Sequence, residues 1–158
     1  MSGLRMLVGS DSAGYDYKQA LLADLQADER VASVVDLGAT AESLDSCTYT
    51  SVATRAGELI MAGEADRAIL VCGTGIGVSI AANKVPGIRA TVAHDSFSVE
   101  RSILSNDCQI LTFGQRVIGL QLARRLAKEW LGYTFDPSSH SKANVDEIVS
   151  YEAAVAAE

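Results

Sequence analysis

The sequence predicts an α/β fold: one domain of three layers, in which a doubly wound sheet of five parallel strands lies between helices. Short apolar runs alternate along the chain with segments whose apolar residues recur at helical spacing. Such alternation implies parallel strands joined by right-handed crossovers, with helices on both faces. The chain has 158 residues, of which 48% are apolar, enough for one ordinary buried core. We therefore expect a single domain over residues 1–158.

The N-terminal half contains two strand-and-helix units. Arg5–Gly9 is a short apolar run, and Tyr15–Gln26 repeats apolar residues at helical spacing. Val31–Leu37 is rich in β-branched residues and is followed by a loop of Ser, Thr and Asp. A helical pattern then runs from Val52 to Met61. Strand and helix therefore alternate twice.

The third unit begins with the apolar run Ala68–Cys72, which meets the turn GTGIG and a helix over Val78–Lys84 that ends before Pro86. Arg89–Ala93 is the fourth strand. Asp95 or Ser96 is well placed to cap the helix that follows, which runs to about residue 104, by accepting hydrogen bonds from its free amides. A pair between His94 and Asp95 is the alternative reading of that carboxylate.

The chain closes with a fifth strand and two helices. Gln109–Phe113 is the strand, Val117–Trp130 is strongly helical, and an amphipathic stretch from about Val145 to Val155 ends the sequence. We expect this C-terminal helix, about 142–157, to pack on the domain or on a partner subunit. The complete pattern is a Rossmann-like three-layer α/β/α sheet, whose ligands bind beyond the carboxyl ends of the strands.

Composition excludes several classes of function. The net charge of −7 leaves no long basic face for nucleic acid. No run of 18 apolar residues and no secretory signal is visible, so we expect a cytoplasmic protein without a membrane span. The three cysteines form no CxxC pair, and the two histidines are far apart. The sequence therefore predicts neither a metal site nor a dithiol centre.

The most informative stretch is the strand end Cys72 with its glycine-rich turn. Glycines let backbone amides approach a ligand closely, and a helix N-terminus favours negative charge. The same field would favour the thiolate form of Cys72. The spacing GxGxG lacks the third-glycine position of a dinucleotide fingerprint, and no GxxxxGK[ST] loop is present. A small buried hydrophobe followed by a tight connection is the structural alternative, which spacing alone leaves open.

These residues resemble a known family. The turn CGTGIG followed by IAANKVPGIRA, the segment GSDSAGYDYK near the start, Tyr49, and SNDCQILTFGQRVIG are similar to motifs of the type B ribose-5-phosphate isomerases and the related galactose-6-phosphate isomerase subunits. The resemblance runs nearly end to end. It implies a parallel-sheet aldose–ketose isomerase of phosphorylated sugars. It also implies a homodimer whose active sites take residues from both subunits, and in some members a dimer of dimers.

The resemblance also implies a role for each residue of the turn. Cys72 matches the catalytic base, which moves a proton between neighbouring carbons through an enediolate. The hydroxyl of Thr74 would handle protons at the oxygens. Backbone amides of the turn would stabilise the oxyanion, namely those of Gly73, Gly75, Ile76 and Gly77. Neither a metal nor an organic cofactor is required by this chemistry.

Further residues match substrate-binding positions of the family. Asp11 and Asn106 match groups that bind sugar hydroxyls or the ring oxygen, and Tyr49 matches an aromatic residue of the pocket. Without the resemblance, they read as a strand-end carboxylate, a helix C-cap and a core edge. Arg116 matches a phosphate-binding arginine, and Arg89 reads as structural.

The sequence departs from the family at two histidines and at the phosphate site. Ser12 and Ser105 stand where the family has histidine, and the histidine at the second position assists opening of a furanose ring. Serine cannot replace it as a general acid or base near neutrality. An arginine-rich C-terminal segment is replaced by DPSSHSKAN, which leaves His140 and Lys142 as cationic candidates, although each also fits a solvated surface charge.

The residues leave two isomerase substrates and two non-isomerase functions to weigh. Ribose 5-phosphate with ribulose 5-phosphate is the family's default pair. Erythrulose 4-phosphate with erythrose 4-phosphate is the alternative, because a tetrose whose terminal hydroxyl carries phosphate cannot close a furanose ring and needs no ring opening. A non-catalytic sugar-phosphate-binding subunit is the second class, which the retained Cys72 argues against. A thiol redox sensor would lack a resolving cysteine nearby in sequence.

Overall fold

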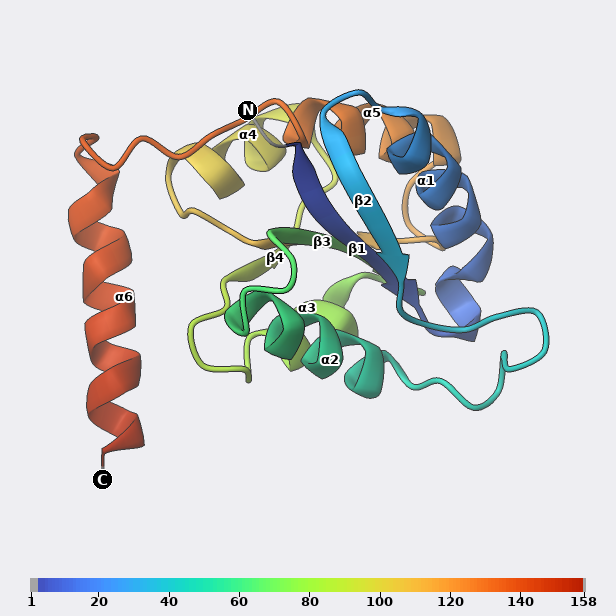
Figure 1. The fold of residues 1–158 in the computed structure, drawn as a ribbon, viewed down its shortest axis with the longest axis horizontal. Coiled ribbons are helices and arrows are strands. Elements are labelled where there is room, and N and C mark those ends of the chain that lie inside the picture. Colours follow the sequence, from blue (N-terminus) through green and yellow to red (C-terminus); the bar gives the residue numbers. More distant parts are fainter. Residues whose placement is uncertain (1–2, 158) are drawn as a thin grey trace.

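The computed structural model describes residues 3–157, so the predicted domain ends at 1 and 158 lie outside the described residues (Figure 1). Its centre is a five-stranded, all-parallel sheet in the order β2-β1-β3-β5-β4. The strands are β1 (Leu4–Ser10), β2 (Val31–Asp36), β3 (Arg67–Cys72), β4 (Ala90–Val92) and β5 (Ile110–Gly114). The predicted α/β class and the number and direction of the strands are confirmed.

All six predicted helices are present. They are α1 (Tyr15–Ala27), α2 (Tyr49–Met61), α3 (Ile76–Ala82), α4 (Ser96–Leu104), α5 (Leu120–Trp130) and α6 (Ser141–Ala156), with a 3₁₀ turn over Ser12–Gly14. Helix α2 begins three residues before the predicted start because the Thr48 side chain caps it, accepting a hydrogen bond from Ser51 N–H at 3.1 Å. Helix α5 begins later than predicted, because the amides of Val117 and Ile118 bond back to Gly114 in a turn.

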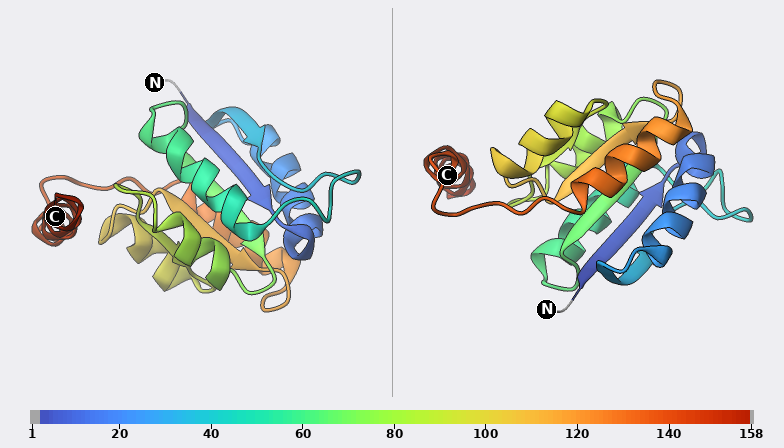
Figure 2. Two further views of the ribbon diagram at one scale, coloured as in Figure 1. Left: turned by 90° about the horizontal axis from the view of Figure 1, so that it is seen from below. Right: turned by 90° about the horizontal axis from the view of Figure 1, so that it is seen from above.

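The helices cover the sheet in two layers (Figure 2). One face packs against α1, α4 and α5, with Trp130 of α5 fully buried. The other face packs against α2 and α3, through small and branched residues such as Ala53 and Val78. Because both faces of the sheet are covered, the central strand β3 is almost entirely apolar, and its side chains are buried from Ala68 to Cys72.

The strand order fixes where a ligand can bind. The chain moves from β1 outward to β2, then returns across β1 to β3, so the order reverses between β1 and β3. In open parallel sheets, ligands bind beyond the carboxyl ends of the strands at such a reversal. The residues that follow these two strands are Asp11 and the Cys72 turn. The fold therefore brings two predicted site segments together.

Helix α6 stands beside the domain and not within its layers (Figure 1). The Gly87 N–H donates to the Glu152 carboxylate at 2.6 Å, and a groove of about 900 Å³ separates α6 from the loop after α3, from β4 and from α4. Much of the helix's apolar surface is exposed, at Ile148, Val149, Tyr151 and Val155. Over residues 3–157, no helix combines the length and apolar content that a membrane span requires.

Candidate active site

Cys72 ends β3 with its side chain held by the turn that follows. The residue is only 4% exposed, and its Sγ accepts a hydrogen bond from the Gly75 N–H at 3.1 Å. A backbone N–H aimed at sulfur stabilises negative charge on it. Cys72 is therefore buried at a strand end, as the structural alternative expects, and its sulfur also accepts a hydrogen bond from the turn.

Gly75 gives the turn its shape. Its φ of +78° lies in the left-handed region, which residues with a side chain rarely adopt. It is also packed so closely that a Cβ would lie 2.9 Å from the Phe113 carbonyl carbon. Gly75 is the N-cap residue of α3, and the Ile76 N–H beside it donates to Thr74 Oγ1 at 3.2 Å. The Gly75 amide is therefore directed at the sulfur, and the exposed Thr74 hydroxyl lies on the same turn.

Tyr49 closes the turn from the side of α2. A Cβ placed on Gly77 would lie 3.0 to 3.2 Å from three ring carbons of Tyr49, so the ring rests against the backbone of Gly77. The Tyr49 side chain is otherwise exposed. The ring therefore lies beside the turn of Cys72, and its place in a substrate pocket stays a prediction.

The segment after β1 lies directly against the end of β3. A Cβ on Gly14 would lie 2.4 Å from the Val71 carbonyl oxygen and 2.9 Å from the Cys72 nitrogen. Asp11 Oδ1 accepts hydrogen bonds from Ala13 N–H at 3.0 Å and Gly14 N–H at 3.2 Å, which fixes its carboxylate. Ser12 between them is exposed. Asp11 is thus a local cap whose carboxylate is held at the end of β1, next to the end of β3.

Arg116 contributes a cation to the same place. The Arg116 N–H donates to the Gly73 carbonyl at 3.0 Å, and its side chain passes over Gly73, with Nη1 3.4 Å from the position of a Cβ there. Ala13 flanks Gly73 from the other side. The guanidinium therefore lies over the turn that begins with the candidate base, where it could bind an anionic group.

Two other predicted residues lie at the opposite edge of the sheet. Ser105 and Asn106 follow α4 and precede β5, so they are near the amino ends of the strands. In register with β5, β3 runs four residues from Ala68 to Cys72, which corresponds to about 13 Å at roughly 3.3 Å per residue. Within one chain, these two residues and the Cys72 thiol are therefore separated by the length of the sheet.

Arg89 fixes this second region. Its guanidinium donates to the carbonyls of Asn106 at 2.9 Å and of Asp107 at 2.9 to 3.1 Å. Asp107 has a φ of +47°, so the arginine holds a turn of unusual backbone conformation. The structural role predicted for Arg89 is confirmed.

His140 and Lys142 lie at the start of α6. His140 is exposed, and the Lys142 ammonium forms an ion pair with Asp146 one helical turn along. Neither lies in the turns around Cys72 described above. As phosphate ligands they remain predictions.

Sequence reasoning gave only part of the role of His94. Asp95 caps α4 by accepting from Ser98 N–H at 2.7 Å, so the helix-cap reading is confirmed. His94 instead accepts the Gly114 N–H at Nε2, at 3.0 Å, and lies against the Phe113 ring. Burial lowers the pKa of His94, although the charge of Asp95 opposes the shift. The neutral ring thus anchors the end of β5 beside the turn.

Cys108 is a second buried thiol, at the other edge of the sheet from Cys72. It is buried two residues before β5, and burial raises its pKa to about 12. Such a thiol stays protonated at neutral pH. Over residues 3–157, no group of three His, Cys, Asp or Glu residues is arranged to hold a metal ion.

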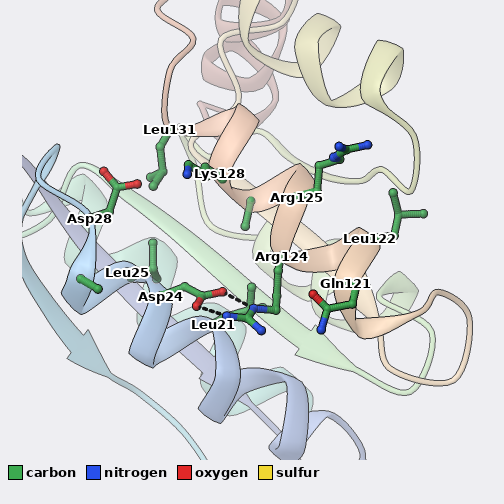
Figure 3. A pocket seen from close by; sticks show the side chains of 12 residues that line it. Leu21, Asp24, Leu25, Asp28, Gln121, Leu122, Arg124, Arg125, Lys128 and Leu131 are labelled. Carbon is green, nitrogen blue, oxygen red and sulfur yellow. Dashed lines mark hydrogen bonds and ion pairs between the residues drawn. The ribbon is translucent and has the colours of Figure 1, made fainter.

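Two grooves are open elsewhere on the molecule. One of about 770 Å³ lies between α1 and α5, where Arg124 forms a bidentate pair with Asp24 at 2.7 Å (Figure 3). The other separates α6 from the domain. Neither is lined by Cys72 or Asp11. The chemistry gathered around the thiol, and not the size of a groove, identifies the candidate site.

Comparisons with known proteins identify the family of the chain. Residues 6–148 match the model of a family described as Ribose/Galactose Isomerase. The chain is 57% identical to a D-erythrulose-4-phosphate isomerase 2 of Mycolicibacterium smegmatis, over 96% of this chain and 99% of that protein. It is 37% identical to ribose-5-phosphate isomerase B of Escherichia coli, over 94% of this chain and 96% of that one.

Solved structures give the same result for the fold. Ribose-5-phosphate isomerase B of Clostridium thermocellum superposes with a TM-score of 0.87 at 37% identity, covering 96% of this chain and 99% of that chain. A type B ribose 5-phosphate isomerase of Leishmania infantum gives a TM-score of 0.88 at 34% identity, covering 95% and 97%.

Proposed function

The chain belongs to the ribose/galactose isomerase family, and we propose that its substrate is a four-carbon sugar phosphate, converted between D-erythrulose 4-phosphate and D-erythrose 4-phosphate. Sugar-phosphate isomerisation itself is the chemistry of this family, and the enzyme is an aldose–ketose isomerase. One residue supports the assignment of a four-carbon sugar. Ser105 stands where the resemblance places the histidine that assists ring opening, and a tetrose 4-phosphate has no furanose ring to open.

We assign the proton transfer to Cys72. Its thiolate removes a proton from C1 of the ketose, which leaves a C1–C2 enediolate, and the resulting thiol returns the proton to C2. The amides of the turn face the negative oxygen, as an oxyanion hole does. The remaining hydroxyl proton must pass from O1 to O2, and the Thr74 hydroxyl beside the Ile76 amide is suited to move it. These groups act without a cofactor.

The remaining contacts orient the substrate. The Asp11 carboxylate, held by two amides, can accept hydrogen bonds from sugar hydroxyls, and the exposed Ser12 lies next to it. Tyr49 forms an edge of the pocket. We place the phosphate near the Arg116 guanidinium, because a planar cation of this kind binds phosphate oxygens in pairs.

The site would be completed by a second copy of the chain. Ser105 and Asn106 lie about 13 Å along the sheet from Cys72, so in one chain they cannot reach the sugar. A homodimer would bring them from the partner, and with them the start of α6, where His140 and Lys142 lie. The exposed apolar residues of α6, and Ile76 and Ile80 of α3, are surface that such an interface would bury. A tetramer of two such dimers is compatible with this arrangement. We also expect a cytoplasmic location, where phosphorylated sugars are retained by their charge.

The first experiment measures turnover of D-erythrulose 4-phosphate and ribose 5-phosphate by the wild type and by Cys72→Ala. We expect the wild type to prefer the tetrose and the variant to lose at least about a hundredfold in kcat, the lower range for a general base. Cys108→Ala is the matched control, since it removes a buried thiol at the far edge of the sheet. If the folded wild type turned over neither sugar, the chain would be a non-catalytic binding subunit.

A second experiment tests the reason for the preference. Ser105→His should raise kcat/KM for ribose 5-phosphate by about tenfold or more while leaving that for the tetrose nearly unchanged, because only the pentose needs acid–base help to open its ring. Ser105→Ala is the control and should alter neither. Equal gains on both sugars would remove ring opening from the explanation.

Mixing two inactive variants tests the shared site. Cys72→Ala and Asn106→Ala each damage a different half, so a mixed dimer contains one intact site. An equal mixture, after subunit exchange, should regain about a quarter of wild-type activity, because half of the dimers are mixed and each has one working site. No recovery despite exchange would place Asn106 outside the partner's site.

A further inference from the structure

Thr112 is a polar residue in the interior of an apolar strand. It lies in the middle of β5, in register with Leu70 of β3 and Val92 of β4, and is fully buried. Its neighbours along the strand, Leu111 and Phe113, are buried and apolar. A valine would fill the same volume without burying a hydroxyl, so the hydroxyl calls for an explanation.

That hydroxyl bonds to the turn of the candidate base. Thr112 Oγ1 donates to the Gly75 carbonyl at 2.8 Å, and the Thr91 carbonyl is a weaker alternative acceptor at 3.4 Å. The Gly75 carbonyl also accepts the first hydrogen bond of α3, from Ser79 N–H at 3.3 Å. The shorter bond therefore ties the start of α3 to the sheet.

The orientation of one peptide unit follows from this bond. In a planar trans peptide, the carbonyl and the following N–H point in opposite directions. Because Thr112 holds the Gly75 carbonyl toward β5, the Ile76 N–H must point away from the sheet, toward Thr74 Oγ1. At the other end of the same residue, the Gly75 N–H points at the Cys72 sulfur.

The turn packs against β5 on one side and is open on the other. Gly75 and Gly114 have no side chains, and backbone lies against backbone: a Cβ on Gly114 would be 2.6 Å from Thr74 backbone atoms. The turn is exposed on its other side, since residue Ile76 is 54% exposed. A hydrogen bond from the buried strand is therefore well placed to decide which way the amides face.

We propose that Thr112 is a positioning residue: it holds the Gly75–Ile76 peptide so that the Ile76 amide faces the developing oxyanion, and by fixing the turn it keeps the Gly75 amide, which belongs to the preceding peptide, directed at the thiolate. This inference rests on the proposed role of Cys72 as the base. Thr112 touches neither the substrate nor the sulfur, and it acts through the turn alone.

The test compares Thr112→Val, which keeps the shape and removes the hydroxyl, with Thr112→Ser, which keeps the hydroxyl. Two quantities are measured for each: kcat and KM with D-erythrulose 4-phosphate, and the pH dependence of iodoacetamide modification at Cys72, followed by mass spectrometry of its peptide. We expect Thr112→Val to lower kcat by about tenfold to a hundredfold, near or below the loss of one oxyanion donor, with little change in KM. Its alkylation midpoint should move to higher pH. Thr112→Ser should restore both.

The outcomes separate this inference from the proposed function. Wild-type kcat and an unchanged alkylation midpoint in Thr112→Val would overturn the positioning role, while the Cys72→Ala result would still decide the base. Retained activity in Cys72→Ala would overturn both. If Thr112→Val did not fold, Thr112→Ala gives a second loss of the hydroxyl, and failure of Thr112→Ser to behave as wild type would count against the hydrogen bond.

Discussion

Lys18 carries a charge into the interior, and its ion pair with Asp36 leads to a quantitative prediction. The Lys18 side chain, on the first turns of α1, is 0% exposed, whereas the Asp36 side chain at the end of β2 is 29% exposed. The ammonium donates to both carboxylate oxygens, at 2.8 and 2.9 Å, and to the Ala39 carbonyl. The pair thus joins α1 to the loop that leads to α2.

Because the two side chains are buried to different extents, removing one should destabilise the fold more than removing the other. Asp36→Asn would leave a fully buried ammonium without its counter-ion, and breaking a buried pair in this way costs about 3–5 kcal/mol of unfolding free energy. Lys18→Met would instead leave a carboxylate that water can reach, and one carbonyl without its donor. That loss is about 1–3 kcal/mol. The aspartate variant should therefore be the less stable of the two.

Urea denaturation of both single variants and of the double variant measures these costs. We expect the double variant to be more stable than the sum of the single losses predicts, because removing both charges leaves no ion unpaired. Removing the exposed Asp24–Arg124 pair is the surface control and should change stability least. A Lys18→Met variant as unstable as Asp36→Asn would refute the argument from unequal burial.

Two further predictions concern the surroundings of the turn. Gly77→Ala should lower activity without lowering the unfolding free energy. Alanine favours helix by up to about 1 kcal/mol, while its Cβ would push the Tyr49 ring aside. Tyr49→Phe keeps the ring and is the control, and a loss of stability that matches the loss of activity would contradict the prediction. For His94, the folded pKa lies below that of the unfolded chain, about 6.5, so below that pH the unfolded state binds more protons and stability falls until the folded pKa is passed. Urea denaturation at several pH values between 7 and 4 should show this fall in unfolding free energy for the wild type. The fall should be smaller for His94→Gln, which keeps a hydrogen-bond acceptor that does not titrate. Equal falls in both proteins would exclude His94 as its source.

Local sequence signals account for most of the fold. Each strand and helix was predictable because apolar spacing reports which face is buried, and the Asp95 cap because its carboxylate is three residues before the amide it bonds. The predictions were wrong at the starts of two helices, α2 and α5. Thr48 as a cap and the turn before α5 depend on side-chain and backbone contacts that periodicity does not report.

The site was predictable only as far as residues lie close along the chain or at one sheet edge. Cys72, its turn and Asp11 meet because the strand order reverses between β1 and β3. The contact of His94 with Gly114 joins residues 20 apart along the chain, and that of Thr112 with Gly75 joins residues 37 apart. A polar residue in the apolar run QILTF was the one visible signal of the second contact.

The direction of the strands explains why residues that the family resemblance assigns to one site lie far apart within a single chain. In a parallel sheet, residues that follow strands and residues that precede them lie on opposite edges, whatever their side chains. Cys72, Arg116 and Asp11 follow strands, whereas Ser105 and Asn106 precede β5. One chemical site can include both groups only if two chains meet with opposite edges adjacent. The distance of about 13 Å between the edges is therefore itself an argument for a shared active site.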